Sequence, residues 1–301
     1  MRKRTILVLL VSIAALISVL FLNWLSVRNS VVGALKKQLR EDFLGKAVLE
    51  DKKAPVHNSE LKLSFAVVTD IHNNTKGLNS AIEEINKSKV QFVIGLGDYT
   101  NVGTKEEFNP IKNSLSRLAK PVYLLPGDHD LWNGRDKDKS PDYYFDEAFP
   151  GDLNDFTKSG VQFLFLDNAD LYEGVHAQAI ETFENELDQT NEPVIIITSH
   201  KAIYHPLTIH RMGYINDTKN EKVAAQATEL LGMINAKKNS KIILLSGDLH
   251  AFSKYNLPSD KYEAYTIGAL TDTKNFQSPR YAIVNVYKDN TVVVSDIPLT
   301  Q

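Results

Sequence analysis

Aspartate and histidine side chains recur in five short motifs, and each motif directly follows an apolar, largely β-branched run. The motifs are Asp70-Ile71-His72, Gly97-Asp98, Gly127-Asp128-His129-Asp130, Ser199-His200 and Gly247-Asp248-Leu249-His250. Carboxylate and imidazole groups are ligands for metal ions, and paired metal ions carry out hydrolytic chemistry. A single aspartate after a strand is commonly only a helix cap or a turn residue, so the repetition carries the argument.

The apolar runs predict the strands that must position these groups. We expect strands over Leu63–Thr69, Val90–Leu96, Val122–Leu125, Val161–Leu166, Val194–Thr198 and Lys241–Leu245. Helical patterns lie between them, over Leu78–Asn86, Glu106–Leu118, Ala177–Leu187 and Glu221–Ile234. Alternating strands and helices indicate an α/β fold, in which ligands bind beyond the carboxyl ends of the strands. We therefore expect the motif side chains to converge at one edge.

The C-terminal part is rich in strands without helices. Strands are predicted over Tyr262–Thr266, Arg280–Tyr287 and Thr291–Val294, with the turn of a hairpin at 288–290. This part should be antiparallel, which makes the fold mixed.

The N-terminus has the pattern of a membrane anchor. Met1-Arg2-Lys3-Arg4 is basic, and no charge interrupts Ile6–Val27. About 20 apolar residues can cross a bilayer, and the basic end stays in the cytoplasm. We expect an anchor over residues 1–27, a juxtamembrane linker over 28–60 and an extracytoplasmic domain over 61–301. A cleaved signal peptide is the alternative.

Composition excludes several other classes of function. The net charge of −3 offers no basic surface for nucleic acid, so no nucleic-acid partner is expected. The chain has no cysteine, which excludes disulfides, thiolate ligands and a cysteine nucleophile. Nothing in the composition indicates an oligomeric state.

The order of the motifs resembles that of the calcineurin-like metallophosphoesterases, from about Leu61 to Pro298. That family carries Asp-x-His, Gly-Asp, Gly-Asn-His-Asp/Glu, a lone His and Gly-His-x-His in this order. Flanking segments are similar too, at 98–101, 166–168 and 265–270. The resemblance implies the metallo-dependent phosphatase fold, with two packed mixed β-sheets flanked by helices.

The resemblance also implies roles for the motif residues. Asp70, His72 and His250 would hold one metal ion. His200 would hold a second ion, with Asp128 and Asp248 as further ligands of that ion, and Asp98 would bridge the two. His129 would face the leaving group of the substrate, with Asp130 orienting its ring.

Two positions depart from the family pattern. Asp128 stands where most members have asparagine, and Asp248 where most have histidine; both would serve the second ion. Four carboxylates, a hydroxide and two divalent ions give a charge of about −1, instead of about +1, which disfavours a phosphate dianion. A trivalent ion, a third cation, or an aspartate that is protonated or binds through water would relieve this charge. The two motifs are partly similar to the alkaline phosphatase D branch, whose cysteine ligand this chain lacks.

We therefore expect a membrane-anchored enzyme that hydrolyses phosphate mono- or diesters by attack of a metal-bound hydroxide, with His129 protonating the leaving oxygen. Two metal ions are expected as cofactors, Mn or Fe before Mg, Ca or Zn, because the second site is rich in oxygen ligands. The alternative is a catalytically inactive module that binds metal and acts as a binding protein. Retention of His129 with Asp130 favours catalysis, since a binding scaffold needs no proton donor.

Residues outside the motifs have simpler expected roles. Arg135 is expected to be a surface arginine rather than a phosphate ligand, and 135–139 a solvated loop. His205 and His210 are expected to be solvated. The segments Leu131–Phe149 and His205–Asn220 are expected to shape the substrate pocket.

Overall fold

The computed structural model describes residues 58–137, 139–151, 153–215, 217–259, 261–275 and 277–299. The predicted anchor, residues 1–27, and residues 28–57 of the predicted linker lie outside these ranges. Among the helices in the described ranges, none combines the length and the apolar composition needed to span a bilayer.

A first sheet has five strands in the order β13-β12-β1-β2-β3. Its strands are β1 (Leu61–Val68), β2 (Val93–Gly95), β3 (Val122–Leu124), β12 (Arg280–Tyr287) and β13 (Val292–Pro298). The first three are parallel, whereas β12 pairs antiparallel with both β1 and β13. The predicted C-terminal hairpin is confirmed.

A second sheet has six strands in the order β10-β11-β9-β6-β5-β4. Its strands are β4 (Phe156–Lys158), β5 (Val161–Leu166), β6 (Val194–Ser199), β9 (Lys241–Ser246), β10 (Ser253–Asn256) and β11 (Glu263–Thr266). The four central strands are parallel, and β4 and β10 pair antiparallel at the edges. A separate short hairpin consists of β7 (Tyr214–Ile215) and β8 (Thr218–Lys219).

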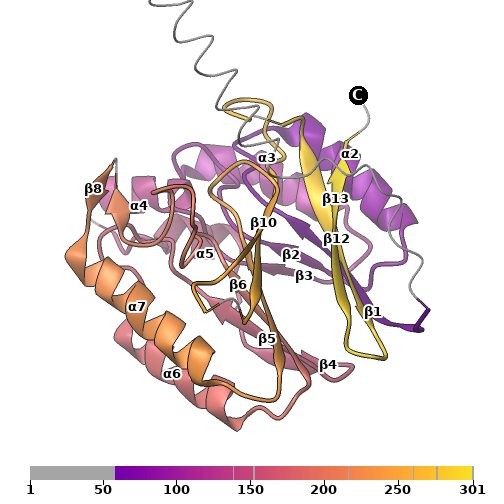
Figure 1. Cartoon of the computed structure of the whole chain (residues 1–301). Coiled ribbons are helices and arrows are strands. Elements are labelled where there is room, and N and C mark those ends of the chain that lie inside the picture. The colour runs from indigo at the N-terminus through magenta and orange to yellow at the C-terminus, as the bar shows by residue number, and fades with distance from the viewer. Residues whose placement is uncertain are drawn as a thin grey trace, which may run out of the picture. The chain divides into compact units, whose positions relative to one another are not determined.

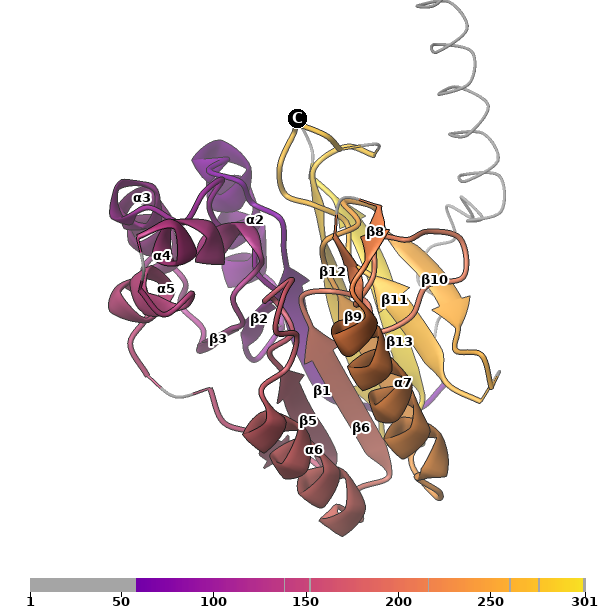
Figure 2. The same ribbon diagram turned by 90° about the vertical axis from the view of Figure 1, so that its left-hand side faces the viewer.

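Helices cover the outer face of each sheet (Figures 1 and 2). They are α2 (Thr75–Lys87), α3 (Lys105–Leu115), α4 (Trp132–Asp136), α5 (Tyr143–Ala148), α6 (Ala177–Gln189) and α7 (Glu221–Ala236), and a 3₁₀ turn, η1, spans His129–Leu131. Side chains alternate along β1: Phe65 and Val67 enter the core between the sheets, whereas Ala66 and Val68 pack beneath α2 and α3. A third apolar cluster joins the second sheet to α6 and α7. The predicted architecture of two mixed sheets flanked by helices is confirmed.

The structure differs from the predicted elements in a few places. The segment Leu131–Phe149, which is not among the predicted helices, contains α4 and α5. β2 is shorter than the apolar run that predicted it, and α3 ends at Leu115 rather than Leu118, because a short turn follows, in which Leu118 N–H donates to the Leu115 carbonyl.

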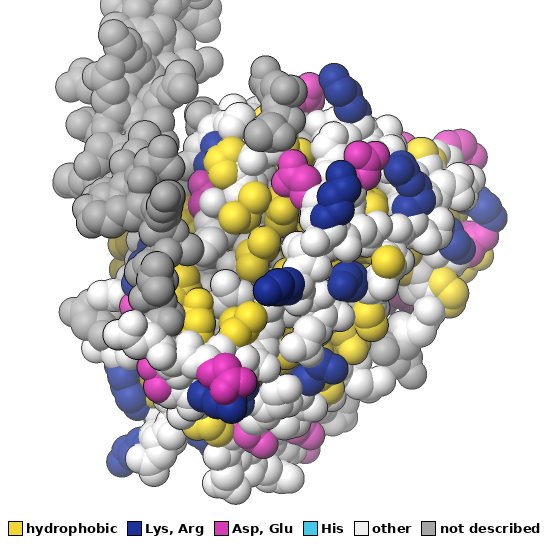
Figure 3. Space-filling view, turned by 90° about the vertical axis from the view of Figure 1, so that its right-hand side faces the viewer, with side chains coloured by type: hydrophobic (Ala, Val, Ile, Leu, Met, Phe, Trp, Pro, Cys, Tyr) yellow, Lys and Arg dark blue, Asp and Glu magenta, His cyan; other side chains and the backbone are white. Residues whose placement is uncertain are grey.

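One side of the molecule shows hydrophobic and charged side chains but no described histidine (Figure 3). Figure 3 views the side on which β12 and β13 lie, where hydrophobic side chains gather among scattered charged groups. No described histidine is visible on this face. The histidine-bearing motifs therefore open on another part of the surface.

Candidate metal centre

The loops that follow β1 and β2 hold their polar side chains on an unusual backbone. Asp70, His72 and Asp98 have φ of 51°, 45° and 56°, and Asp248 and His250, after β9, have φ of 64° and 55°. Aspartate and histidine adopt this left-handed region more readily than most residues with a Cβ. The N–H groups of Asp70 and His72 donate to the carbonyls of Gly97 and Asp98, each at 3.0 Å, so the first two loops are tied together.

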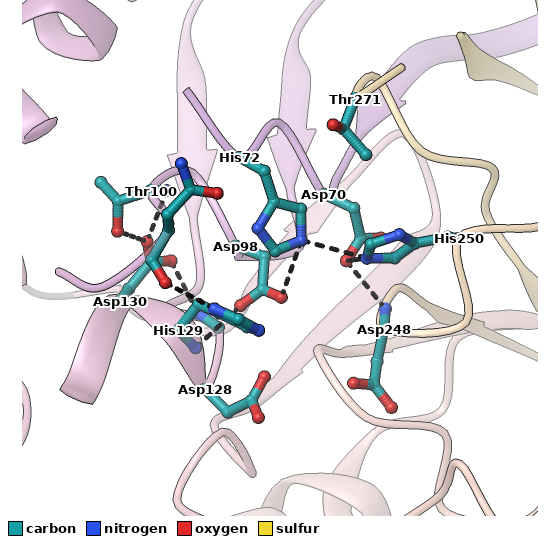
Figure 4. Close-up of polar contacts among 12 residues, drawn as sticks. Asp70, His72, Asp98, Thr100, Asp128, His129, Asp130, Asp248, His250 and Thr271 are labelled. Carbon is teal, nitrogen blue, oxygen red and sulfur yellow. Dashed lines mark hydrogen bonds and ion pairs between the residues drawn. The ribbon is translucent and has the colours of Figure 1, made fainter. Parts of the chain in front are cut away.

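Asp70, His72, Asp98 and His250 form a first ligand group, with donor atoms within 4.8 Å of one another (Figure 4). The Nε2 atoms of His72 and His250 lie 3.0 Å apart. Nε2 of His72 is 3.4 Å from Oδ2 of Asp98, and Nε2 of His250 is 3.4 Å from Oδ1 of Asp70. Oδ2 of Asp70 is buried without a hydrogen-bond partner among the described residues. A buried carboxylate oxygen in this state is available to a cation, and two histidines lie beside it, so the group fits a metal ion.

Asp98, Asp128 and His200 form a second ligand group. Nδ1 of His200 lies 2.7 Å from the Leu96 carbonyl, which can only accept, so Nδ1 donates and Nε2 is free to bind metal. Nε2 of His200 is 3.2 Å from Oδ1 of Asp128 and 3.5 Å from Oδ1 of Asp98. Asp98 thus belongs to both groups, with one oxygen towards each histidine, as a bridging carboxylate requires.

Asp248 lies beside the second group, but a lysine holds it. Its Oδ1 is 3.9 Å from Nε2 of His200 and 3.0 Å from Nζ of Lys201, which is buried. Nothing in the sequence pattern singled out Lys201 except its place directly after His200. Its ammonium group adds a positive charge that the count of four carboxylates left out, so the centre is less negative than expected.

Burial and neighbouring charges set the protonation of the ligands. Burial lowers the pKa of His72 to about 4, although Asp70 opposes this effect, so the ring is neutral and able to bind metal at pH 7. Burial raises the pKa of Asp98 well above its usual range, against the charge of His200, and Asp128 and Asp70 raise it further. A bound cation would reverse that shift, because it favours the ionised carboxylate.

Asp130 does not hold the ring of His129, so the predicted orienting role of Asp130 is wrong. Nδ1 of His129 lies 2.6 Å from the carbonyl oxygen of Asn101, and its ring packs on Trp132 with centroids 4.0 Å apart. Asp130 is fully buried and accepts hydrogen bonds from backbone N–H groups of Tyr99, Thr100 and Gly127 and from the Thr100 hydroxyl. These interior donors need an acceptor, and the Asp130 side chain supplies it.

Both ligand groups open into a cavity of about 860 Å³. The two segments expected to shape the pocket contribute to its lining, with Trp132 and Arg135 from one and His210 and Tyr214 from the other. Arg135 pairs with Asp170 at 3.1 Å and lies over the ring of Tyr172. It is therefore a partly exposed arginine that is already paired, not a free phosphate ligand.

His205 is buried, which corrects its expected place in a solvated loop. Its Nδ1 accepts a hydrogen bond from the N–H of Leu207, and its ring lies 4.5 Å from that of Tyr255, centroid to centroid. Burial, with the charge of Arg211, lowers the pKa of His205 to about 4. The residue thus holds the loop after β6 in its neutral form.

Comparisons with known proteins agree with this geometry. A model of the calcineurin-like phosphoesterase family matches residues 63–252. A 3′,5′-cyclic-nucleotide phosphodiesterase of Nostoc sp. is 21% identical over 264 residues, which is 78% of this chain and 91% of that protein. A probable glycerophosphodiester phosphodiesterase of Arcobacter nitrofigilis is 28% identical over 206 residues, 65% of this chain and 68% of that protein.

Solved structures share the fold at low sequence identity. A dimetal phosphatase from Danio rerio superposes with a TM-score of 0.61 at 13% identity, covering 80% of this chain and 98% of that one. PhoD superposes with a TM-score of 0.56 at 14% identity, covering 81% and 70%.

Proposed function

The chain belongs to the calcineurin-like phosphoesterase family, and we propose that it is a metal-dependent phosphoester hydrolase that prefers diesters and is tethered to a membrane. The observation that carries the enzymatic part is the position of Asp98, which faces a histidine of each ligand group. Metal ions at the two groups would lower the pKa of water and bind the phosphoryl oxygens of the substrate.

In this proposal, His129 gives a proton to the leaving oxygen. The Asn101 carbonyl accepts from Nδ1, which leaves Nε2 as the atom for proton transfer, and Trp132 fixes the plane of the ring. The side chain lines the cavity beside Asp98 and Asp128. A positioned donor of this kind contributes about 10²–10⁴-fold to the rate when the leaving group is poor.

Charge supports the preference for diesters. Four carboxylates and the ammonium group of Lys201, with two divalent ions and a hydroxide, bring the formal charge of the centre to about 0, which is lower than the about +1 of a centre with two carboxylates. A diester carries one negative charge, so the lower charge of the centre weakens the binding of a diester less than that of a phosphomonoester dianion. The names of the two relatives, both phosphodiesterases, support the same preference.

The test compares leaving groups in full-length, Mn²⁺-loaded protein. His129→Ala should slow hydrolysis of an alkyl phosphodiester by about 10²–10⁴-fold and that of bis(4-nitrophenyl) phosphate far less, since nitrophenolate leaves without a proton. His176→Ala is the control, because His176 is exposed and makes no side-chain cap of α6. Equal losses on both substrates would remove His129 from this role. A metal-loaded wild type without activity on any ester would favour the inactive binding module.

The membrane tether rests on the sequence of Met1–Val27. A basic cluster precedes an uncharged segment long enough to cross a bilayer, so the domain would lie on the extracytoplasmic side. Cell fractionation should find the full-length protein in the membrane, and added protease should reach the domain from outside. Full-length protein in the cytoplasmic fraction would refute the tether.

A further inference from the structure

Lys201 carries a buried positive charge at the edge of the second ligand group. Its side chain is 8% exposed, and its Nζ lies 3.0 Å from Oδ1 of Asp248, which is 12% exposed. Both side chains line the same cavity as Asp128 and His129. Because little water reaches the pair, its charges act strongly on whatever occupies that cavity.

The backbone of Lys201 is held on both sides by one buried side chain. Oδ1 of Asn168 accepts from the N–H of Lys201 at 2.9 Å, and Nδ2 of Asn168 donates to its carbonyl at 2.7 Å. The Ser199 hydroxyl donates to the same carbonyl at 2.9 Å. This double contact gives Asn168, just after β5, a structural role, and it fixes the backbone position from which the lysine side chain extends.

The side chain of Asp248 is directed to the lysine. In Figure 4 its carboxylate points away from Asp70 and His250, while its backbone N–H donates to Oδ1 of Asp70 at 3.2 Å. The three residues whose donor atoms lie close enough to share the second ion are Asp98, Asp128 and His200. Asp248 therefore lies outside this group and holds an ammonium group.

We propose that Lys201, held by Asp248, is a fixed positive charge of the active site. The pair faces the phosphoryl group of the substrate and occupies the position where a further ligand of the second ion would otherwise lie. The contact between the Lys201 ammonium group and the substrate rests on the proposed phosphoesterase function. The effect of the ammonium group on metal affinity is independent of that function, because the group repels a metal ion whatever the reaction is.

The proposal predicts opposite effects on metal affinity for the two members of the pair. Lys201→Met removes the repulsion and releases Oδ1 of Asp248, whose Oδ2 already has no hydrogen-bond partner among the described residues. The second Mn²⁺ should bind more tightly, by about tenfold or more, which corresponds to ~1.4 kcal/mol. Asp248→Asn leaves the ammonium unpaired, so the second ion should bind about tenfold more weakly. If Asp248 were an ordinary metal ligand and Lys201 had only a structural role, both variants would bind the second Mn²⁺ more weakly.

Kinetics should show what the cation does for the substrate. At saturating Mn²⁺, Lys201→Met should lower kcat/KM for a phosphodiester by about tenfold or more despite the tighter metal binding, because a charge beside the phosphoryl oxygens is lost. The double variant Lys201→Met, Asp248→Asn avoids an unpaired buried carboxylate and should fold even where the single variant does not. Its metal affinity should return towards that of the wild type, while kcat/KM stays low.

The experiment is a calorimetric Mn²⁺ titration of the full-length chain after chelation, followed by kinetics on bis(4-nitrophenyl) phosphate. Lys254→Met is the control, because Lys254 forms an exposed pair with Glu263 and should change neither quantity. Opposite shifts in second-ion affinity support the proposal. Shifts of the same sign, unchanged affinities, or an unchanged kcat/KM in Lys201→Met would overturn it. A wild type without phosphoesterase activity would refute the proposed function, and the titration would still decide the role of the pair.

Discussion

Replacing Gly127 with alanine would place a methyl group against the carboxylate that both ligand groups share. A Cβ at this position would lie 2.1 Å from the backbone nitrogen of Asp98 and 2.2 Å from its Oδ1. Real Cβ contacts essentially never fall below 3.0 Å, so Asp98 or the loop that carries Gly127 must move by about 0.9 Å. Oδ1 of Asp98 also accepts the N–H of His129 at 3.0 Å, so this movement would disturb the proton donor as well.

The size of the effect follows from this displacement. Overpacking of an interior position typically destabilises by about 1–3 kcal/mol. A misplacement of about 1 Å among catalytic groups lowers the rate by about 10²-fold. Gly127→Ala should therefore unfold at a lower denaturant concentration, bind Mn²⁺ more weakly at both groups and lose about two orders of magnitude in kcat/KM.

Gly232→Ala is the matched control. Gly232 lies in α7 with nothing within 4 Å of an added Cβ, so alanine there should stabilise the protein by about 0.5–1 kcal/mol and leave activity unchanged. Urea unfolding, metal titration and diester hydrolysis on both variants provide the comparison. Wild-type metal affinity and activity in Gly127→Ala would refute the argument that the close approach to Asp98 positions the centre.

Three further outcomes are expected. When the free metal concentration is about 100 times the Kd of a site, removing the metal from that site should lower the free energy of unfolding by ~2.7 kcal/mol. Denaturant titration with and without EDTA measures this difference. Asp130→Ala should destabilise the protein by about 3 kcal/mol or more, because the N–H groups of Tyr99, Thr100 and Gly127 lose their acceptor, whereas Asp130→Asn should lose less. Burial raises the pKa of Asp155 to about 6, so its contribution to stability is present below about pH 4 and is lost as the pH rises through about 6. Asp155→Asn should make the fall in stability between these pH values less steep, by less than ~1.4 kcal/mol per pH unit, since the side chain is only partly buried. Urea unfolding at several pH values measures this change. The same pH dependence in the variant and the wild type would refute the reasoning.

The strands could be predicted because their apolar runs are continuous and end sharply. β5 and β12 have the same bounds as the runs that predicted them, since both are bordered by polar or turn-forming residues. The helices α4 and α5 could not be predicted in the same way, because charged residues interrupt any apolar period between Leu131 and Phe149.

The ligand groups could be predicted in outline because parallel strands bring their carboxyl ends together. The hydrogen-bond and ion-pair partners of individual side-chain atoms could not be predicted. The carbonyl of Asn101 reaches His129 through the path of a loop, and Lys201 meets Asp248 only because β6 and β9 are neighbours in the sheet. Such contacts depend on backbone direction in space, which residue types alone do not encode.

The left-handed backbone at the ligands limits how such a centre can be altered by protein engineering. Most residues with a Cβ are disfavoured in this conformation by about 1–2 kcal/mol, while aspartate, asparagine and histidine tolerate it better. Glutamate in place of Asp70, Asp98 or Asp248 would therefore strain the backbone, and its longer side chain would also displace the carboxylate, although that carboxylate is chemically the same. Asp128, with φ of −66°, carries no such restriction. A library designed to change the metal preference of this protein should vary position 128 freely and restrict the left-handed positions to aspartate, asparagine, histidine and glycine.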